Sequence, residues 1–135
     1  MLKLVAMLPI LACLPLAAQD ADGRKKFAGT WEARFKDQII CTIRVKAGEP
    51  ITGETAGCRI NVDDNGDLKA PEGDEPSDTG SPMINPTVHG EVLSFEDKDG
   101  NDVMKFEMKL VGDGQAELTI LDPPVPLKPI HFARK

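Results

Sequence analysis

The sequence predicts an all-β protein, a small antiparallel up-and-down barrel of about eight short strands, with a β-sandwich as the alternative. Apolar and polar residues alternate along most segments after residue 28, and this period of two is typical of strands with one buried face. These segments recur about every ten residues between turns rich in glycine, proline and asparagine. Helical spacing of apolar residues is not sustained over three turns, so we expect little helix.

The first predicted strand covers residues 30–36. Trp31, Ala33 and Phe35 fall on one face, and charged residues occupy the positions between them. We therefore expect a strand with its aromatic side in the core.

The next two predicted strands carry two of the three cysteines. Residues 38–46 alternate, and a turn at residues 47–50 leads into the strand that holds Cys58. Residues 1–18 are a predicted export signal, as described below, and its removal leaves Cys41 and Cys58. Two cysteines in an exported domain are usually paired. The alternative is a redox or metal-binding thiol pair, but the sequence has no C-x-x-C motif and no histidine near these cysteines. The predicted register places Cys41 opposite Cys58, Ile43 opposite Ala56 and Ile39 opposite Ile60.

Three further apolar segments, around residues 93–95, 104–110 and 116–120, form a predicted meander joined by glycine-rich turns. Thioether and aromatic side chains on these strands fill a core in the preferred interpretation and face a ligand in the alternative. The residues assigned to this core or ligand-facing set are Phe35, Phe95, Met104, Phe106, Met108 and Leu118.

Residues 1–18 form a predicted secretion signal. Lys3 precedes an apolar stretch that ends at Ala18, and charged residues follow immediately. Two prolines interrupt this stretch, which is also shorter than the roughly 20 apolar residues of a membrane-spanning helix. We expect cleavage after Ala18, leaving a short polar segment at residues 19–28 and one β-barrel domain at residues 29–135.

An exported domain of this kind is secreted or periplasmic. The alternative is a lipoprotein, because residues 10–13 resemble a lipobox that ends at Cys13. Five apolar or small residues follow Cys13 where a polar tether is usual, so simple cleavage is the preferred prediction.

The start of the first strand, Gly29, Thr30 and Trp31, resembles the G-x-W opening of the calycin group, the lipocalin and avidin barrels. The resemblance implies that Trp31 closes one end of a barrel and packs against a basic residue of the last strand. Arg134 shares the phase of Ile130 and Phe132 and is the expected partner. Avidin's biotin pocket needs further tryptophans and tyrosines, whereas this chain has one tryptophan and no tyrosine, so the resemblance does not extend to biotin.

Residues 61–72 contain the one site-like constellation of the sequence. Their spacing approaches that of a calcium-binding EF-hand loop, in which oxygen ligands recur at alternate positions. Pro71 and a strand before Asn61 deny the loop its two helices, so we expect a hairpin turn and no specific metal site. The residues of the disfavoured calcium site are Asp63, Asn65, Asp67 and Glu72.

A long acidic loop rich in proline and glycine covers residues 63–83 in this prediction. A solvated connector is the preferred interpretation, and an element that recognises a basic protein partner is the alternative.

Composition narrows the classes of function. The net charge of −6 disfavours nucleic acid as a partner, and no segment after the signal could span a membrane as a helix. Neither histidine lies in a catalytic or metal-binding motif, so we expect no enzymatic activity and no cofactor. Two functions remain, a barrel that binds a small apolar ligand and an extracytoplasmic protein-interaction or inhibitor module, and in either case we expect a monomer.

Overall fold

The computed structural model describes residues 23–73, 80–99, 101–121 and 127–135. The predicted signal at residues 1–18, with Cys13, lies outside the described residues, as does part of the predicted acidic loop, residues 74–79. The described chain contains one helical turn at residues 23–27 and eleven strands.

Nine of these strands form one antiparallel sheet, in the order β6-β3-β2-β1-β11-β10-β9-β8-β7. Strands β4 and β5 form a separate hairpin. The strands are β1 (Gly29–Phe35), β2 (Gln38–Lys46), β3 (Thr52–Ala56), β4 (Asn61–Val62), β5 (Leu68–Lys69), β6 (Gly80–Pro82), β7 (Ile84–His89), β8 (Val92–Asp99), β9 (Asp102–Gly112), β10 (Gln115–Leu121) and β11 (Ile130–Arg134).

The sheet nearly closes into a barrel, because its two edge strands are consecutive in the chain. Only Met83 separates β6 from β7, and its backbone N donates a hydrogen bond of 2.9 Å to Gly53 O on β3. This confirms the predicted all-β, antiparallel, barrel-like fold. The sheet has nine strands instead of about eight, since the strand that closes it is interrupted at Met83.

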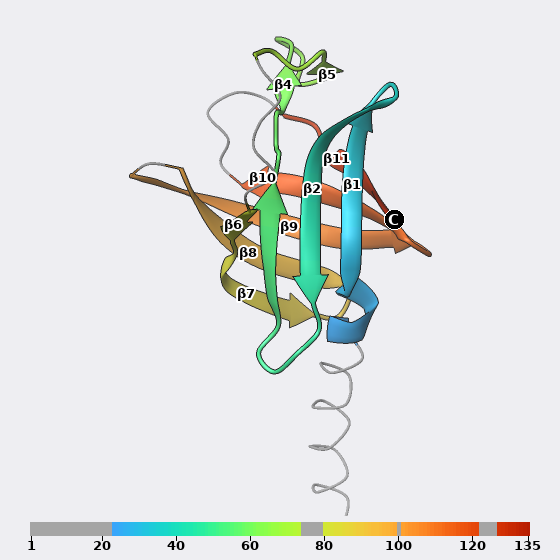
Figure 1. Cartoon of the computed structure of the whole chain (residues 1–135), viewed down its shortest axis with the longest axis vertical. Helices are drawn as coiled ribbons and strands as arrows, with labels where there is room; N and C mark the ends of the chain where they lie inside the picture. The colour runs from blue at the N-terminus through green and yellow to red at the C-terminus, as the bar shows by residue number, and fades with distance from the viewer. Residues whose placement is uncertain (1–22, 74–79, 100, 122–126) are drawn as a thin grey trace, which may run out of the picture.

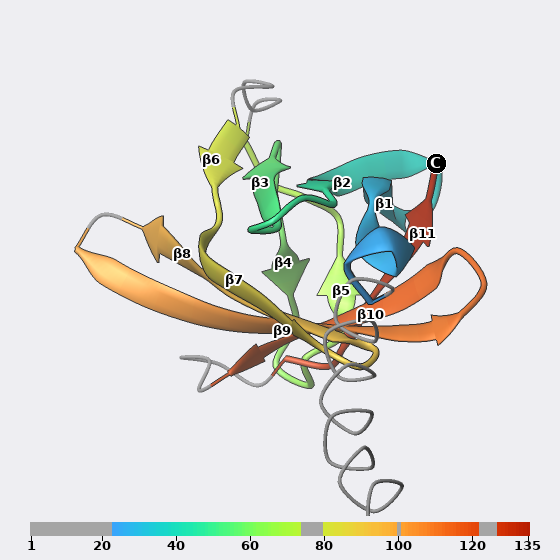
Figure 2. The ribbon, with the colours of Figure 1, turned by 90° about the horizontal axis from the view of Figure 1, so that it is seen from below.

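Two layers of strands cross in this barrel. In Figure 1, β1, β2 and β3 stand upright in front of β8, β9 and β10, which run across them. Figure 2 shows the same two groups on opposite sides of the molecule. The helical turn lies at one end and the β4–β5 hairpin at the other, so the two ends are built from different elements (Figure 1).

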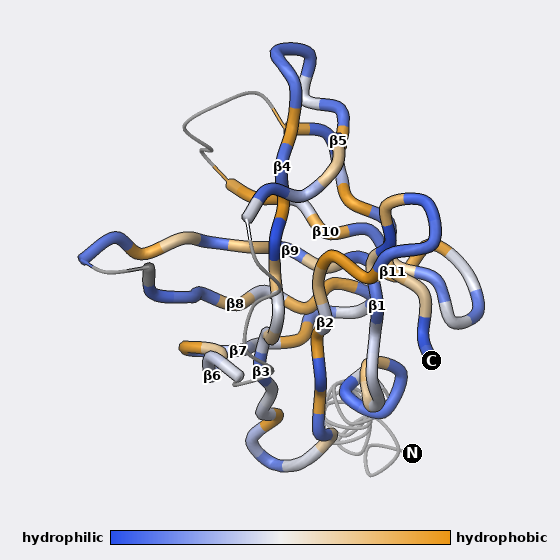
Figure 3. Tube along the Cα trace, turned by 45° about the horizontal axis from the view of Figure 1, so that its top comes forward, coloured by the Kyte–Doolittle hydropathy of each residue, from blue (hydrophilic) through white to orange (hydrophobic). Residues whose placement is uncertain are grey.

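The core packs around the strand that carries the tryptophan. Trp31, Phe27 and Phe132 are fully buried, and Leu93 and Met108 pack in the same apolar cluster. Hydrophilic residues gather at the turns that join the strands, including the tip beyond β4 (Figure 3). The alternation predicted for β1 is therefore present, with Trp31 and Ala33 inward.

The predicted meander is also present. Leu93 pairs with Met108, which pairs in turn with Leu118. Phe95 lies opposite Phe106 with stacked rings whose centroids are 5.1 Å apart.

One part of the predicted β2–β3 register is wrong. Ala56 pairs with Thr42 and not with Ile43. Gly57 then adopts a positive φ of 58°, which glycine tolerates without a steric penalty. Beyond this residue the register moves by one, so that Arg59 N donates to Ile40 O at 2.6 Å.

The inward position predicted for Ile39 is also wrong, because this side chain is 38% exposed. Ala33 pairs with Cys41 and Arg34 pairs with Ile39, so Ile40 is an extra residue on β2. Such a β-bulge turns the strand locally and brings Ile40 into the core in place of its neighbour. The predicted Ile39–Ile60 pair does not occur in the sheet, since β3 ends at Ala56.

Candidate functional site

A partly open cavity of about 510 Å³ lies inside the barrel, and Val62 of the β4–β5 hairpin is among the residues that line it. Strands β2, β8, β9 and β10 line it because each turns alternate side chains inward. Most of its wall is apolar, and the main apolar residues are Ile43, Phe95, Met104, Phe106, Leu118 and Ile120.

The disulfide forms part of this wall. Cys41 and Cys58 are joined as predicted, and both line the cavity. Cys41 is buried on β2, whereas Cys58 follows the register change at Gly57, which carries it back toward Cys41. The bond thus fixes the chain that leads from β3 into the hairpin.

Of the described residues that line the cavity, the acidic one is Asp97 on β8. Its Oδ1 accepts hydrogen bonds from Ser81 Oγ on β6 at 2.7 Å and from Lys98 N at 2.8 Å. Its Oδ2 accepts a hydrogen bond of 3.1 Å from Thr55 Oγ1 on β3. These contacts connect β8 to the edge of the sheet formed by β3 and β6, and within the described part of the chain no cationic side chain pairs with Asp97.

The turn predicted between the segments at residues 93–95 and 104–110 begins later than the sequence indicates, so Asp97 lies in a strand. Strand β8 continues to Asp99, so Asp97 keeps the inward phase of Leu93 and Phe95. The aspartates and glycine that follow Phe95 are typical of a turn, so the sequence indicates a strand that ends earlier than β8 does. The signal that could have placed Asp97 on the inward face is the period of two of a strand, because Asp97 lies two residues beyond Phe95.

Trp31 and Arg134 pack against each other beside the helical turn. These residues are paired across β1 and β11, and the Arg134 guanidinium carbon lies 4.7 Å from the centroid of the indole ring. Trp31 Nε1 donates to Phe27 O at 2.9 Å, and Arg134 Nη2 donates to Lys26 O at 2.8 Å. Both side chains therefore hold the helical turn against the barrel.

The acidic segment beside the cavity forms the predicted hairpin turn, flanked by β4 and β5. Asp63 Oδ1 accepts hydrogen bonds from Asn65 N at 2.9 Å and Asp67 N at 3.0 Å. The backbone hydrogen bond from Asp67 is the main reason why the pKa of Asp63 lies below its usual value. Because Asp63 Oδ1 already accepts hydrogen bonds from two backbone amides, Asp63 is poorly placed to act as a calcium ligand.

Among the described residues, no group of three or more histidine, cysteine, aspartate or glutamate side chains could hold a metal ion. The absence of a specific calcium site stays a prediction, since part of the acidic loop lies outside the description.

A lysine from the segment before β11 anchors the hairpin. Lys128 Nζ donates to Asp67 Oδ1 at 2.7 Å, and Lys128 N donates to Gly66 O at 3.1 Å. The hydrogen bond to Asp67, followed by its charge, raises the pKa of Lys128. Because Val62 and Leu127 line the cavity, this contact also fixes two parts of its wall.

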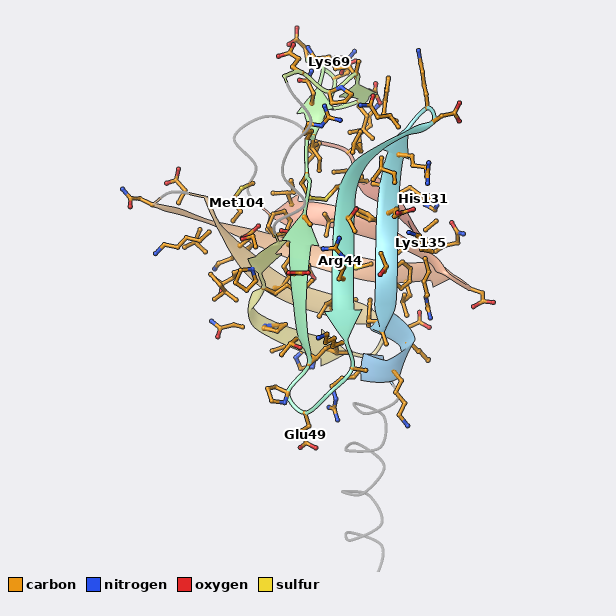
Figure 4. The ribbon with its side chains drawn as sticks, in the orientation of Figure 1. Arg44, Glu49, Lys69, Met104, His131 and Lys135 are labelled. Carbon is orange, nitrogen blue, oxygen red and sulfur yellow. A yellow bond between two sulfur atoms is a disulfide. The ribbon has the colours of Figure 1, made fainter. Side chains whose placement is uncertain are left out.

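The predicted core or ligand-facing set divides into two groups. Phe95, Met104, Phe106 and Leu118 line the cavity, and Figure 4 shows Met104 on β9. Met108 is fully buried in the core, and Phe35 packs against the core without lining the cavity.

Neither histidine is near the cavity. His89 ends β7 and is exposed, and His131 is exposed on β11, where Figure 4 labels it. Neither histidine is therefore among the residues that line the cavity with Asp97.

Comparison with protein-family models, with curated proteins and with solved structures gave no match. No helix in the described residues has the length and apolar character needed to cross a membrane.

Proposed function

We propose that this protein binds a small apolar or amphipathic molecule inside its barrel. The observation that supports the proposal is the cavity of about 510 Å³ with a mainly apolar wall. Ligand sites usually occupy roughly 300–1,000 Å³ and combine apolar walls with a few polar groups. A packed interior would instead favour the alternative, a protein-interaction module that acts through its acidic loop.

The driving force for binding is the removal of apolar surface from water. The cavity wall includes two aromatic rings, Phe95 and Phe106, already stacked on one another. Because the disulfide and the anchored hairpin hold neighbouring parts of the wall, little ordering is needed when the ligand enters.

The test is a titration with N-phenyl-1-naphthylamine, a neutral apolar dye whose fluorescence rises in apolar surroundings. Ile120→Trp should weaken dye binding at least about tenfold, since the indole would occupy part of the cavity. Thr119→Trp is the matched control, because Thr119 is the next residue on β10 and is exposed. We expect the control to bind the dye as the wild type does.

Two results would contradict the proposal. One is a wild-type protein that does not bind the dye. The other is an equal loss of binding in both tryptophan variants, because it would show that the dye occupies the surface instead of the cavity.

We also propose that the protein works outside the cytoplasm, as a secreted or periplasmic monomer that starts at Gln19. The disulfide between Cys41 and Cys58 supports an oxidising compartment. The intact mass of the exported protein tests this proposal. Retention of Met1 in that form would contradict it, and a lipid on Cys13 would show the lipoprotein alternative.

A further inference from the structure

We propose that Asp97 makes the cavity selective for amphipathic molecules that carry a basic nitrogen, such as primary alkylammonium ions. The inference rests on the proposed binding function and names the class of ligand. It depends on the juxtaposition of one carboxylate with the apolar wall of the cavity.

The carboxylate of Asp97 is oriented but not neutralised. Its three hydrogen-bond donors, the Ser81 and Thr55 hydroxyls and the Lys98 amide, carry no net charge. They fix both oxygens in place, and a carboxylate can accept about four hydrogen bonds, so acceptor capacity remains for a ligand. An ammonium group would add the cationic partner that the described residues do not supply.

Among the described residues, the one cationic residue that lines the cavity is Lys98, next to Asp97 on β8. Consecutive residues of a strand point to opposite faces, and the Lys98 residue is exposed. No ion pair in the described part of the chain joins its ammonium group to Asp97. The net charge of −6 on the whole chain also favours cationic over anionic ligands.

The surroundings of Asp97 suit the rest of such a ligand. Met104 is its partner on β9, and Phe95 and Phe106 lie in the same walls of the cavity. A nitrogen bound at Asp97 would leave an alkyl chain to run along Phe106, Leu118 and Ile120. Thioether and aromatic surfaces of this kind adapt to chains of different shape.

The experiment compares octylammonium, octanol and octanoate by calorimetric titration near pH 7, where the first is cationic and the last anionic. We expect octylammonium to bind at least about tenfold more tightly than octanol, because a hydrogen bond to a charged group in an apolar site is strong. Octanoate should bind most weakly. This order of affinities is measured with the wild-type protein alone.

The variant Asp97→Asn keeps the size of the side chain. Its amide oxygen can accept the hydrogen bonds from Ser81 Oγ and Lys98 N, and its amide nitrogen can donate to Thr55 Oγ1, since a hydroxyl can also accept. The variant should weaken octylammonium at least about tenfold and leave octanol within about twofold. Asp102→Asn is the matched control, since it removes the same charge from an exposed position that does not line the cavity. We expect the control to keep the wild-type order.

Two outcomes would overturn the inference while the proposed binding function stands. In the first, the wild type binds octanol as tightly as octylammonium. In the second, Asp97→Asn weakens all three compounds equally, which would assign Asp97 a purely structural role between β8 and β6. If the naphthylamine dye and all three octyl compounds fail to bind the wild type, both the inference and the proposed function are wrong.

Discussion

Arg134 is exposed to solvent, yet it contacts the fully buried side chain of Trp31. Its guanidinium covers the buried indole of Trp31, and its Nη2 donates to Lys26 O in the helical turn. Trp31 holds the same turn through Phe27 O. A single surface residue thus contributes both a cation–π contact between β1 and β11 and a hydrogen bond from β11 to the helical turn.

Replacing Arg134 with glutamine should lower the free energy of unfolding by about 1 kcal/mol, because it removes an exposed cation–π contact and a hydrogen bond. The fluorescence of Trp31, the only tryptophan, reports the unfolding in urea. Lys135→Gln is the control and should stay within about 0.5 kcal/mol of the wild type. An equal effect of both variants would show that charge at this end, and not the contact with Trp31, is responsible.

The β4–β5 hairpin is too short to be stable alone, since each of its strands has two residues. It is held by contacts outside its own ladder. Asp63 closes its turn, Lys128 anchors its tip, and Val62 faces the cavity. The element is therefore a part of the cavity wall whose order depends on charged groups at the surface.

Protonation of Asp63 should loosen this turn in acid. The pKa of Asp63 is lowered in the folded state, so its contribution to stability is complete above about pH 4, the range of an unfolded aspartate. That contribution is lost as the pH falls through the lower folded-state pKa. The amide proton shifts of Asn65 and Asp67 measure the titration directly, because both amides donate to Asp63.

Asp63→Asn is the control for this titration. Its side-chain oxygen still accepts the two hydrogen bonds but does not titrate, so the two amides should lose the pH-dependent shift that they share through Asp63. A wild-type midpoint at or above the ordinary aspartate pKa would contradict the assignment.

The strands could be predicted from the sequence because their signal is local. Each inward face of β1, β9 and β10 follows a period of two that needs no knowledge of neighbouring strands. The bulge at Ile40 and the register change at Gly57 add single residues whose positions depend on how neighbouring strands fit together. The place of Asp97 in the cavity could not be predicted for a related reason. The sequence around Asp97 does not show that the hydroxyls of Ser81 and Thr55, on other strands, donate hydrogen bonds to its carboxylate.

At the scale of the whole molecule, the barrel depends on a seam that joins the two ends of its strand order. Gly53 accepts the hydrogen bond from Met83 N, at the point where β6 gives way to β7. Asp97 adds the side-chain link from β8 to β6. The first and last strands, β1 and β11, are neighbours in the middle of the sheet, so the seam is formed by the middle of the chain.

Gly53→Ala tests whether this seam supports the complete barrel. A Cβ at Gly53 would lie 2.7 Å from Arg44 O and 2.8 Å from Met83 Sδ, so the backbone of β2 or β3 must shift. We expect a loss of about 1–3 kcal/mol in the free energy of unfolding. Because a barrel that closes through one seam should unfold as a unit, far-UV circular dichroism and Trp31 fluorescence should give the same lowered midpoint.

Gly112→Ala is the matched control for this variant, because its nearest neighbours would lie 3.6 Å from the new Cβ, an ordinary contact distance. It should stay within about 0.5 kcal/mol of the wild type. A Gly53→Ala protein whose circular dichroism changes at lower urea than its Trp31 fluorescence would contradict the prediction. The seam would then open independently of β1, and the part of the barrel around the Trp31–Arg134 contact would be a separate unit of stability.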